Sequence, residues 1–206
     1  SILNPARPRA VSARHIVGQV LADVGFGGLG QAIPDRVPAE GTSCLWMITV
    51  RGEDARSGAR FATTVVTNGG TGARPGIDGL SATAYPSGVR GTPVEIVESM
   101  TPLLFWRKEL REGSGGRGTW RGGDGLELEI ENRSGHTLDL LAAFDRIEHP
   151  PRGCDGGADG ATGELALKNS GRTLAGKGTQ QIPAGEILSI RTPGGGGLGD
   201  PAKRAR

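Results

Sequence analysis

The sequence contains few cysteines, few histidines and no long apolar run. Cys44 and Cys154 are the only cysteines among 206 residues, too few for a disulfide framework. His15, His136 and His149 are scattered without metal-ligand spacing, so no metal site built from this chain alone is expected. No stretch approaches the roughly 18 apolar residues of a membrane span, and no secretory signal is present. These absences predict a cytoplasmic protein that has no contact with a membrane.

An excess of charge of one sign is also lacking. The 24 basic and 22 acidic residues leave a net charge of +2, which argues against a nucleic-acid-binding protein. Only four of the basic residues are lysines, so arginine dominates. Genomic bias is the simpler explanation, and a preference for bidentate contacts with anions is the alternative.

Glycine, by contrast, is abundant. The chain has 37 glycines and 13 prolines, a content near the range at which low complexity becomes the usual interpretation. These residues follow no period and gather in clusters between apolar runs. This arrangement predicts many tight turns that join short strands.

Residues 11–33 place apolar side chains at nearly helical spacing, with Ser12 as a candidate N-cap and Pro34 as the stop. Residues 25–30 read Gly-x-Gly-x-x-Gly. A dinucleotide-binding fingerprint has to follow a strand and open a helix, whereas this one lies inside or at the end of a helix. We therefore expect these glycines either to allow close packing against a neighbour or to break the helix in two.

The remaining apolar runs predict strands. Residues 44–51 and 59–67 form a predicted hairpin around a polar turn, and residues 126–131 alternate strictly, which predicts one buried face and one acidic, solvated face. Further strands are expected at 103–110, 117–121, 137–144, 164–167 and 187–191. The fold class is α+β and rich in β: an N-terminal helix and a glycine-rich loop region (1–125), followed by an antiparallel β-sandwich or folded sheet with a glycine-rich tail (126–206).

A second apparent nucleotide motif lies in residues 171–178, Gly-x-x-x-x-Gly-Lys. A phosphate-binding loop of this type needs Ser or Thr after the lysine, and Gly178 stands there instead. We interpret the segment as a hairpin that does not bind ATP.

The stretch around which the chain is organised is the loop of residues 68–91, which carries seven glycines and two prolines. Long loops are usually functional or disordered, and here both flanks predict order. The strand-like residues 61–67 precede it, and Thr92, Pro93 and Glu95 form a capping box for a short helix that ends by Thr101. Function and architecture are equally good explanations for the loop, because glycine-rich segments also occur where sheets or subunits meet.

This loop holds the candidate site residues. Its glycines can present amides to an anion or a developing oxyanion, and its arginines can hold a carboxylate or phosphate. Asp78 either closes a turn or faces substrate, and Glu95 either caps the helix or takes part in catalysis. The candidate catalytic residues are Arg90 and Glu95, and the candidate substrate-binding residues are Gly69, Gly70, Gly72, Arg74 and Asp78.

Five segments in this order resemble one family: SILNPARPRAVSARH, GGTGARPGIDGLSATAYPSGVRGTPVEIVE, RKELREGSGGRGTWRGGDG, FDRIEHPPRGCDGG and TPGGGGLGDP. The chain resembles the hydantoinase B/oxoprolinase family, the B subunits of ATP-dependent hydantoinases and 5-oxoprolinases. Acetone carboxylase, acetophenone carboxylase and caprolactamase have related subunits. One departure is Gly113, which stands where the family usually has an Asp.

The resemblance implies a function within an assembly. In such enzymes an A subunit uses ATP and Mg to phosphorylate the substrate oxygen, and the B subunit hydrolyses the activated amide with a divalent metal held by its N-terminal part. Because Ser1 is not an initiator Met and that part is absent from the 206 residues, we expect this chain to be the C-terminal portion of a B subunit, inactive alone and without a cofactor of its own. The implied partners are the N-terminal part of B, the ATP-binding A subunit and a small cyclic amide, in a cytoplasmic hetero-oligomer.

Two other functions stay open at this stage. The chain could be part of an ATP-dependent ketone carboxylase of the same family. It could also be a non-catalytic interaction or scaffolding module, which would suit the absence of a metal motif.

Overall fold

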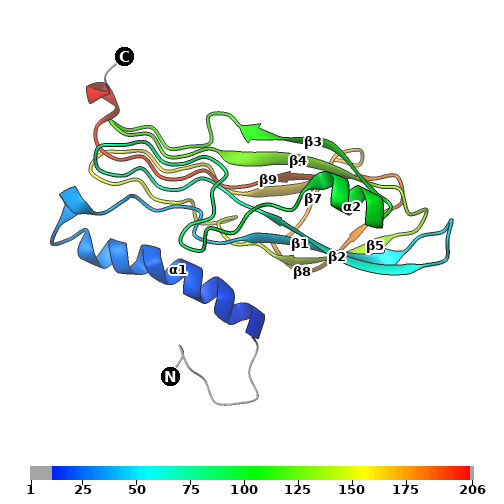
Figure 1. The fold of residues 1–206 in the computed structure, drawn as a ribbon. Coiled ribbons are helices and arrows are strands. Elements are labelled where there is room, and N and C mark those ends of the chain that lie inside the picture. The colour runs from blue at the N-terminus through cyan, green and yellow to red at the C-terminus, as the bar shows by residue number, and fades with distance from the viewer. Residues whose placement is uncertain (1–10, 205–206) are drawn as a thin grey trace.

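A computed structural model describes residues 11–204, with side chains from residue 16 onward (Figure 1). The helices are α1 (Val11–Leu29), η1 (Pro34–Arg36), α2 (Val94–Met100) and η2 (Pro201–Lys203). The strands are β1 (Trp46–Glu53), β2 (Arg60–Thr67), β3 (Leu103–Arg111), β4 (Gly125–Asn132), β5 (Leu138–Ala143), β6 (Glu164–Leu167), β7 (Arg172–Thr173), β8 (Lys177–Ile182) and β9 (Ile187–Arg191). The α+β, β-rich class is confirmed, while the Ser12 cap and the His15 side chain lie outside the described side chains.

The strands form two antiparallel sheets that pack face to face. One has the order β2-β1-β5-β8 and the other β3-β4-β9-β6-β7. A single core cluster takes buried side chains from both sheets, so the sandwich interpretation is confirmed. Alternation along β1 explains how the core forms, because Trp46, Ile48 and Val50 are buried while Met47 and Arg51 are exposed.

The predicted hairpin between β1 and β2 is present, with Trp46 opposite Thr67 and Glu53 opposite Arg60. The proposed division at residue 125 stays a prediction. Strands from both sides of it share each sheet, since β5 pairs with β1 and β9 reaches β3 through β4.

The acidic face of β4 is less exposed to solvent than expected. Glu129 is only 8% exposed and is held by Lys168, whose Nζ lies 2.7 and 2.8 Å from its two carboxylate oxygens. Glu127 accepts a 3.0 Å bond from Arg191. The face is acidic as predicted, but basic side chains rather than water cover much of it.

Five extended segments continue from one end of the sandwich and run side by side (Figure 1). We call this group the glycine-rich bundle; it comprises residues 38–42, 68–73, 114–124, 151–161 and 193–199. The last segment is the centre. Gly195 donates to Gly123 O at 2.9 Å, Gly196 to Glu40 O at 2.8 Å and Gly197 to Ala158 O at 2.9 Å, so backbone bonds join it to three others.

Close backbone approach explains why this bundle is made of glycine. A Cβ placed on Gly195 would lie 1.9 Å from Thr71 O, and one placed on Gly70 would lie 1.8 Å from Gly123 O. No side chain fits at such distances. The glycine clusters therefore build a packed tertiary element rather than only the predicted turns.

Two predicted β elements are wrong. Residues 117–121 form no strand, because Trp120 makes only an isolated bridge to Leu198 within the bundle. Residues 171–178 form no hairpin, because β7 pairs with β6 and β8 pairs with β5 in the opposite sheet. Buried Leu174 lies in the common core at this crossing.

Both predicted helices exist, but their details differ. α1 continues through Gly25, Gly27 and Gly28, so the helix is not broken, and a Cβ at any of the three would meet nothing within 4 Å in the described chain. The capping box at α2 is wrong: Pro93 is the N-cap and no side chain caps the helix. Thr92 instead accepts a 3.0 Å bond from the amide of Val66 at the end of β2.

Candidate functional site

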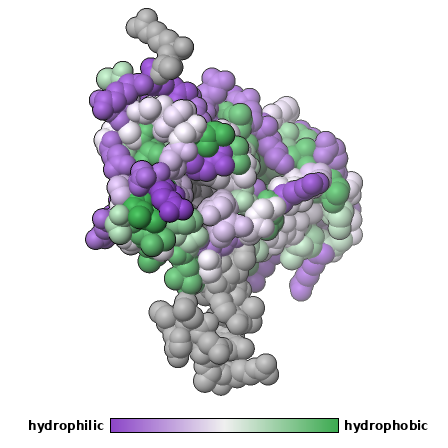
Figure 2. All heavy atoms as spheres, turned by 60° about the vertical axis from the view of Figure 1, so that its left-hand side comes forward, coloured by the Kyte–Doolittle hydropathy of each residue, from purple (hydrophilic) through white to green (hydrophobic). Residues whose placement is uncertain are grey.

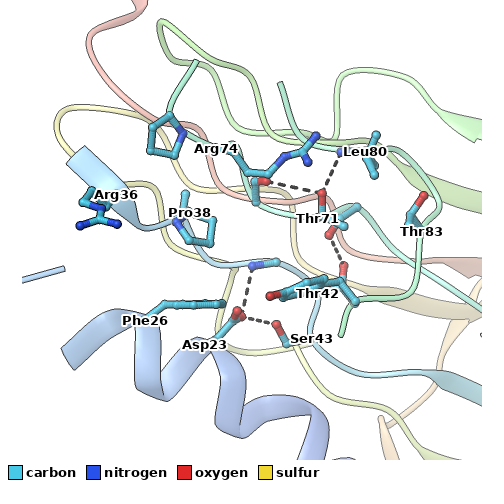
Figure 3. Close-up of a pocket in the computed structure, with 16 residues that line it drawn as sticks. Asp23, Phe26, Arg36, Pro38, Thr42, Ser43, Thr71, Arg74, Leu80 and Thr83 are labelled. Carbon is cyan, nitrogen blue, oxygen red and sulfur yellow. Dashed lines mark hydrogen bonds between the residues drawn. The ribbon is translucent and has the colours of Figure 1, made fainter. Parts of the chain in front are cut away.

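A cavity of about 350 Å³ lies where α1 meets the glycine-rich bundle (Figure 3). Its walls come from α1, from residues 36–43 and from residues 70–85 of the long loop. Phe26, Pro38, Leu80 and Tyr85 make much of the wall apolar, and the rings of Phe26 and Tyr85 stack with centroids 6.4 Å apart. Ligand sites are typically of this kind, concave and mostly apolar with a few polar groups.

The residues around the cavity mouth are partly apolar as well. Leu80 is 49% exposed and Tyr85 is 44% exposed. Figure 2 brings the bundle end of the molecule forward and shows hydrophobic groups lying beside hydrophilic residues on this face.

Asp23 is the buried acid of the cavity. Its side chain reaches from α1 towards the loop of residues 41–43 (Figure 3), and the residue is only 6% exposed. Its Oδ2 accepts a 3.1 Å bond from the Gly41 amide, a 3.2 Å bond from Arg146 Nη2 and a bond from Ser43 Oγ. Within residues 11–204 no hydrogen bond is made to Oδ1, so this oxygen keeps its acceptor capacity.

The charge of Asp23 is set by opposing effects. Burial raises the pKa of its carboxyl, and the contacts with Ser43, Arg146 and Gly41 oppose that rise without cancelling it, so the pKa lies above its ordinary value. A buried carboxyl with a raised pKa in a cavity wall is typical of a functional site.

Arg146 links Asp23 to a second acid. Its Nη1 lies 2.9 Å from Glu40 Oε2, and Glu40 in turn pairs with Arg152 at 2.7 Å. Burial alone would raise the pKa of Glu40, but the bonds from Arg152 and the charge of Arg146 lower it below its usual range. Ser43 and Arg146 adopt φ angles of 50° and 62°, which are uncommon for residues other than glycine and show that this network fixes the backbone.

Arg74 supplies positive charge on the opposite wall (Figure 3). Its Nη2 donates to Asp78 O at 3.3 Å, and its Nε is buried without a hydrogen-bond partner. The neighbouring Asp78 carboxylate is taken by Arg204 and by the Arg121 amide. Among the described residues, neither Arg74 nor the exposed cavity residue Arg36 forms an ion pair with a carboxylate.

The structure brings some of the predicted site residues together and separates others. Gly70, Gly72 and Arg74 line the cavity. Gly69 packs against Thr42 and Pro193, while exposed Arg90 and Glu95 lie outside the lining. The functional roles of all seven stay predictions.

Close packing accounts for two of the loop glycines. The Gly70 amide donates to Pro193 O at 3.0 Å, so it is not available to an anion, and a Cβ on Gly72 would lie 1.8 Å from Ala39 O. At these positions the architectural explanation of the loop is sufficient.

Sequence reasoning missed Asp23 and Ser43. A signal for Asp23 was present, because it is the only charged residue between Ile16 and Gly30. A single charge in such a stretch predicts a buried or paired group, but its partners Gly41, Ser43 and Arg146 come from other parts of the chain.

The described residues offer no ready metal site. Among the side chains that the structure describes, from residue 16 to residue 204, no three from His, Cys, Asp or Glu gather in a group that could hold a metal ion. Over the same range, no helix combines the length and apolar character needed to cross a membrane.

Comparison with known proteins identifies relatives that are much longer. An uncharacterized protein of Methanocaldococcus jannaschii is 35% identical over 208 residues, covering 99% of this chain and 36% of that protein. Arabidopsis thaliana 5-oxoprolinase 1 is 45% identical over 135 residues, covering 64% of this chain and 10% of that protein. The crystal structure of the ATP-dependent caprolactamase from Pseudomonas jessenii superposes with a TM-score of 0.72 at 27% identity, over 86% of this chain and 32% of that chain.

The family model for hydantoinase B/oxoprolinase matches residues 1–201. This match covers all five sequence segments on which the resemblance was based. The prediction is confirmed, and this chain belongs to the hydantoinase B/oxoprolinase family.

Proposed function

We propose that this chain is the C-terminal portion of the B subunit of an ATP-dependent hydrolase of cyclic amides, and that it completes the substrate cavity of that enzyme. The similarity to an ATP-dependent caprolactamase over 86% of the chain is the observation that carries this proposal. A 5-oxoprolinase is a second relative, and caprolactam and 5-oxoproline are both cyclic amides. The partners would be the N-terminal part of B and an ATP-binding A subunit, in a hetero-oligomer.

The chemistry explains why two subunits would cooperate. An amide carbon is a poor electrophile because nitrogen donates electron density to the carbonyl. Phosphorylation of the amide oxygen by the A subunit converts ATP to ADP and makes the carbon electrophilic. Water then adds to that carbon, and the ring C–N bond breaks as the nitrogen takes up a proton, which leaves an acyl phosphate. A second water hydrolyses the acyl phosphate, so that phosphate and an amino acid are released.

The residues of this chain would bind and orient the ring during the second step. The apolar side chains of Phe26, Leu80 and Tyr85 would hold the hydrocarbon part and exclude bulk water, which would otherwise compete with the positioned nucleophile. Asp23, Arg36 and Arg74 are the charged residues of the wall, and they can orient polar atoms of the substrate.

The cofactors would lie in the partner parts. Since the described residues gather no metal-binding group, we propose that the divalent metal is held by the N-terminal part of B and that ATP and Mg are bound by the A subunit.

Reconstitution tests this function. The chain is combined with the N-terminal part of B and the A subunit, and native mass spectrometry establishes the assembly. We expect ADP and the ring-opened product to form from hydantoin, 5-oxoproline or caprolactam only when all three polypeptides and ATP are present. An intact complex that consumes ATP with a ketone and bicarbonate, and with none of the cyclic amides, would assign the carboxylase function instead.

A further inference from the structure

We propose that one side of α1 is the surface on which the N-terminal part of B docks, and that the docking element presents an uncharged, apolar face to it. The identity of this partner rests on the proposed function, whereas the surface is argued from the structure. We call the surface the outward face of α1; its residues, all exposed, are Val17, Gly18, Leu21, Val24, Gly25, Gly28 and Leu29.

The polarity of α1 is the reverse of that of an ordinary surface helix. Gln19 and Asp23 are the only polar side chains in residues 16–29, and both are buried towards the rest of the chain. Gln19 Nε2 donates to Ser87 Oγ at 3.0 Å, and Figure 3 shows Asp23 pointing from α1 towards the bundle. A surface helix normally turns its apolar side inward and its polar side to water. In α1 the side turned to water is the apolar one.

The exposed apolar side chains form one stripe. Val17, Leu21, Val24 and Gly28 follow one another at spacings of four, three and four residues, which is the spacing of a seam between packed helices. Val24 is 64% exposed and Leu29, beside the stripe, is 50% exposed. Single exposed apolar residues are common, but a continuous stripe marks an interaction surface.

The glycines of α1 point to the same conclusion independently. A Cβ placed on Gly18, Gly25 or Gly28 would meet nothing within 4 Å in the described chain. Packing within this chain therefore does not require glycine there, unlike in the glycine-rich bundle. Glycine inside a helix lowers its stability relative to alanine, and its advantage is that another element can approach the backbone closely. The three hollows lie on the outward face, beside Leu21 and Val24, where side chains of a partner would fit.

The length of the relatives indicates what covers this face. This chain covers 36% of the Methanocaldococcus jannaschii protein and 32% of the caprolactamase chain, so roughly two thirds of each polypeptide lies outside the matching part. A partner of that size needs a surface on which to pack. It would be apolar at the contact, because a charged group set against the outward face would lose water and gain no opposite charge.

The test measures binding and does not depend on activity. The N-terminal part of B, as a separate polypeptide, is titrated with the unmodified 206-residue chain by isothermal titration, and analytical ultracentrifugation gives the stoichiometry. We expect a one-to-one complex. Val24→Glu should weaken it by at least about tenfold, because the carboxylate would be buried without a partner. Met100→Glu, an equivalent change at an exposed position of α2, should leave the affinity unchanged.

A glycine variant separates docking from folding. Gly25→Leu should raise the urea concentration at which the free chain unfolds, because leucine favours the helix and its Cβ meets no described atom. It should also weaken the complex by about tenfold, because it fills a hollow that the partner needs. A more stable chain with unchanged affinity would overturn the inference. Urea unfolding also checks the Val24→Glu fold, and if that variant does not fold, Gly25→Leu decides.

Other outcomes assign the face differently. The inference is overturned if no complex forms, or if Val24→Glu and Met100→Glu weaken it equally. A dimer of the free chain that Val24→Glu dissociates, without binding of the N-terminal part, would assign the face to a second copy. The two proposals can fail separately. A complex that docks through α1 but opens no cyclic amide contradicts only the proposed function, and one that opens the ring but binds Val24→Glu equally well contradicts only this inference.

Discussion

Arg204 holds Asp78 in a bidentate ion pair, with Nη1 2.9 Å from Oδ1 and Nη2 2.8 Å from Oδ2. Asp78 also accepts a 2.7 Å bond from the Arg121 amide. The bond from Arg204 is the main cause that lowers the pKa of Asp78 below its ordinary value. These contacts connect the end of the chain to the loop that supplies Arg74 and Leu80 to the cavity.

The first prediction concerns this ion pair. Because the two side chains are 44% and 42% exposed, Arg204→Gln should lower the free energy of unfolding by less than about 1 kcal/mol. It should nevertheless speed hydrogen exchange at the amides of Gly79 and Leu80, whose loop loses an anchor. Lys203→Gln is the control, and equal exchange rates in both variants would show that the ion pair does not restrain the loop.

A second prediction separates two kinds of glycine. Gly195→Ala places a Cβ 1.9 Å from Thr71 O, so it should destabilise the chain by at least about 3 kcal/mol or prevent folding. Gly28→Ala lies in α1, where a Cβ meets nothing within 4 Å, and should stabilise by roughly 0.5–1 kcal/mol. Urea unfolding of both variants is the measurement, and a stable Gly195→Ala chain would contradict the close packing of the bundle.

Glu40 provides a prediction on acid stability. Its pKa is lowered in the folded state, so the stability that it contributes is present above its ordinary pKa of 4.5 and is lost as the pH falls through the folded pKa. Glu40→Gln should therefore cost about 2 kcal/mol at neutral pH, because Arg146 and Arg152 lose a charged partner. Unfolding is measured from neutral to acidic pH. The difference in unfolding free energy between the wild-type chain and Glu40→Gln should shrink below pH 4.5. A difference that is independent of pH would exclude the ion pairs as its cause.

Asp23 should make the free energy of unfolding depend on pH in the opposite direction. Its pKa is raised in the folded state, so the stability linked to it is fully present below 3.8 and is lost as the pH rises through the folded pKa. The unfolding free energy of the wild-type chain minus that of Asp23→Asn should therefore fall as the pH rises from 3.8. The same titrations in urea test this, and a difference that grows with pH would show that contacts with Arg146 and Ser43 outweigh burial.

Much of the fold follows from local patterns. The hairpin of β1 and β2, the strands β4, β6 and β9, and both helices were predicted because period, β-branched residues and Pro stops act over a few residues. The errors arose where local patterns are ambiguous. Residues 117–121 resemble a short strand, but Trp120 pairs with Leu198 in the bundle. Thr92 and Glu95 have capping-box spacing, but the Thr92 hydroxyl is used by Val66.

The sequence by itself determined the family, the α+β class and the positions of the glycine clusters. Only the tertiary structure decided what those glycines approach, that Asp78 is held by Arg204, and that Asp23 and Arg74 share a cavity. The physical reason is the range of the interactions. Backbone preference and burial period are set within a few residues, whereas the partners of Asp23 and Asp78 lie up to 123 and 126 positions away and meet only when the whole chain packs.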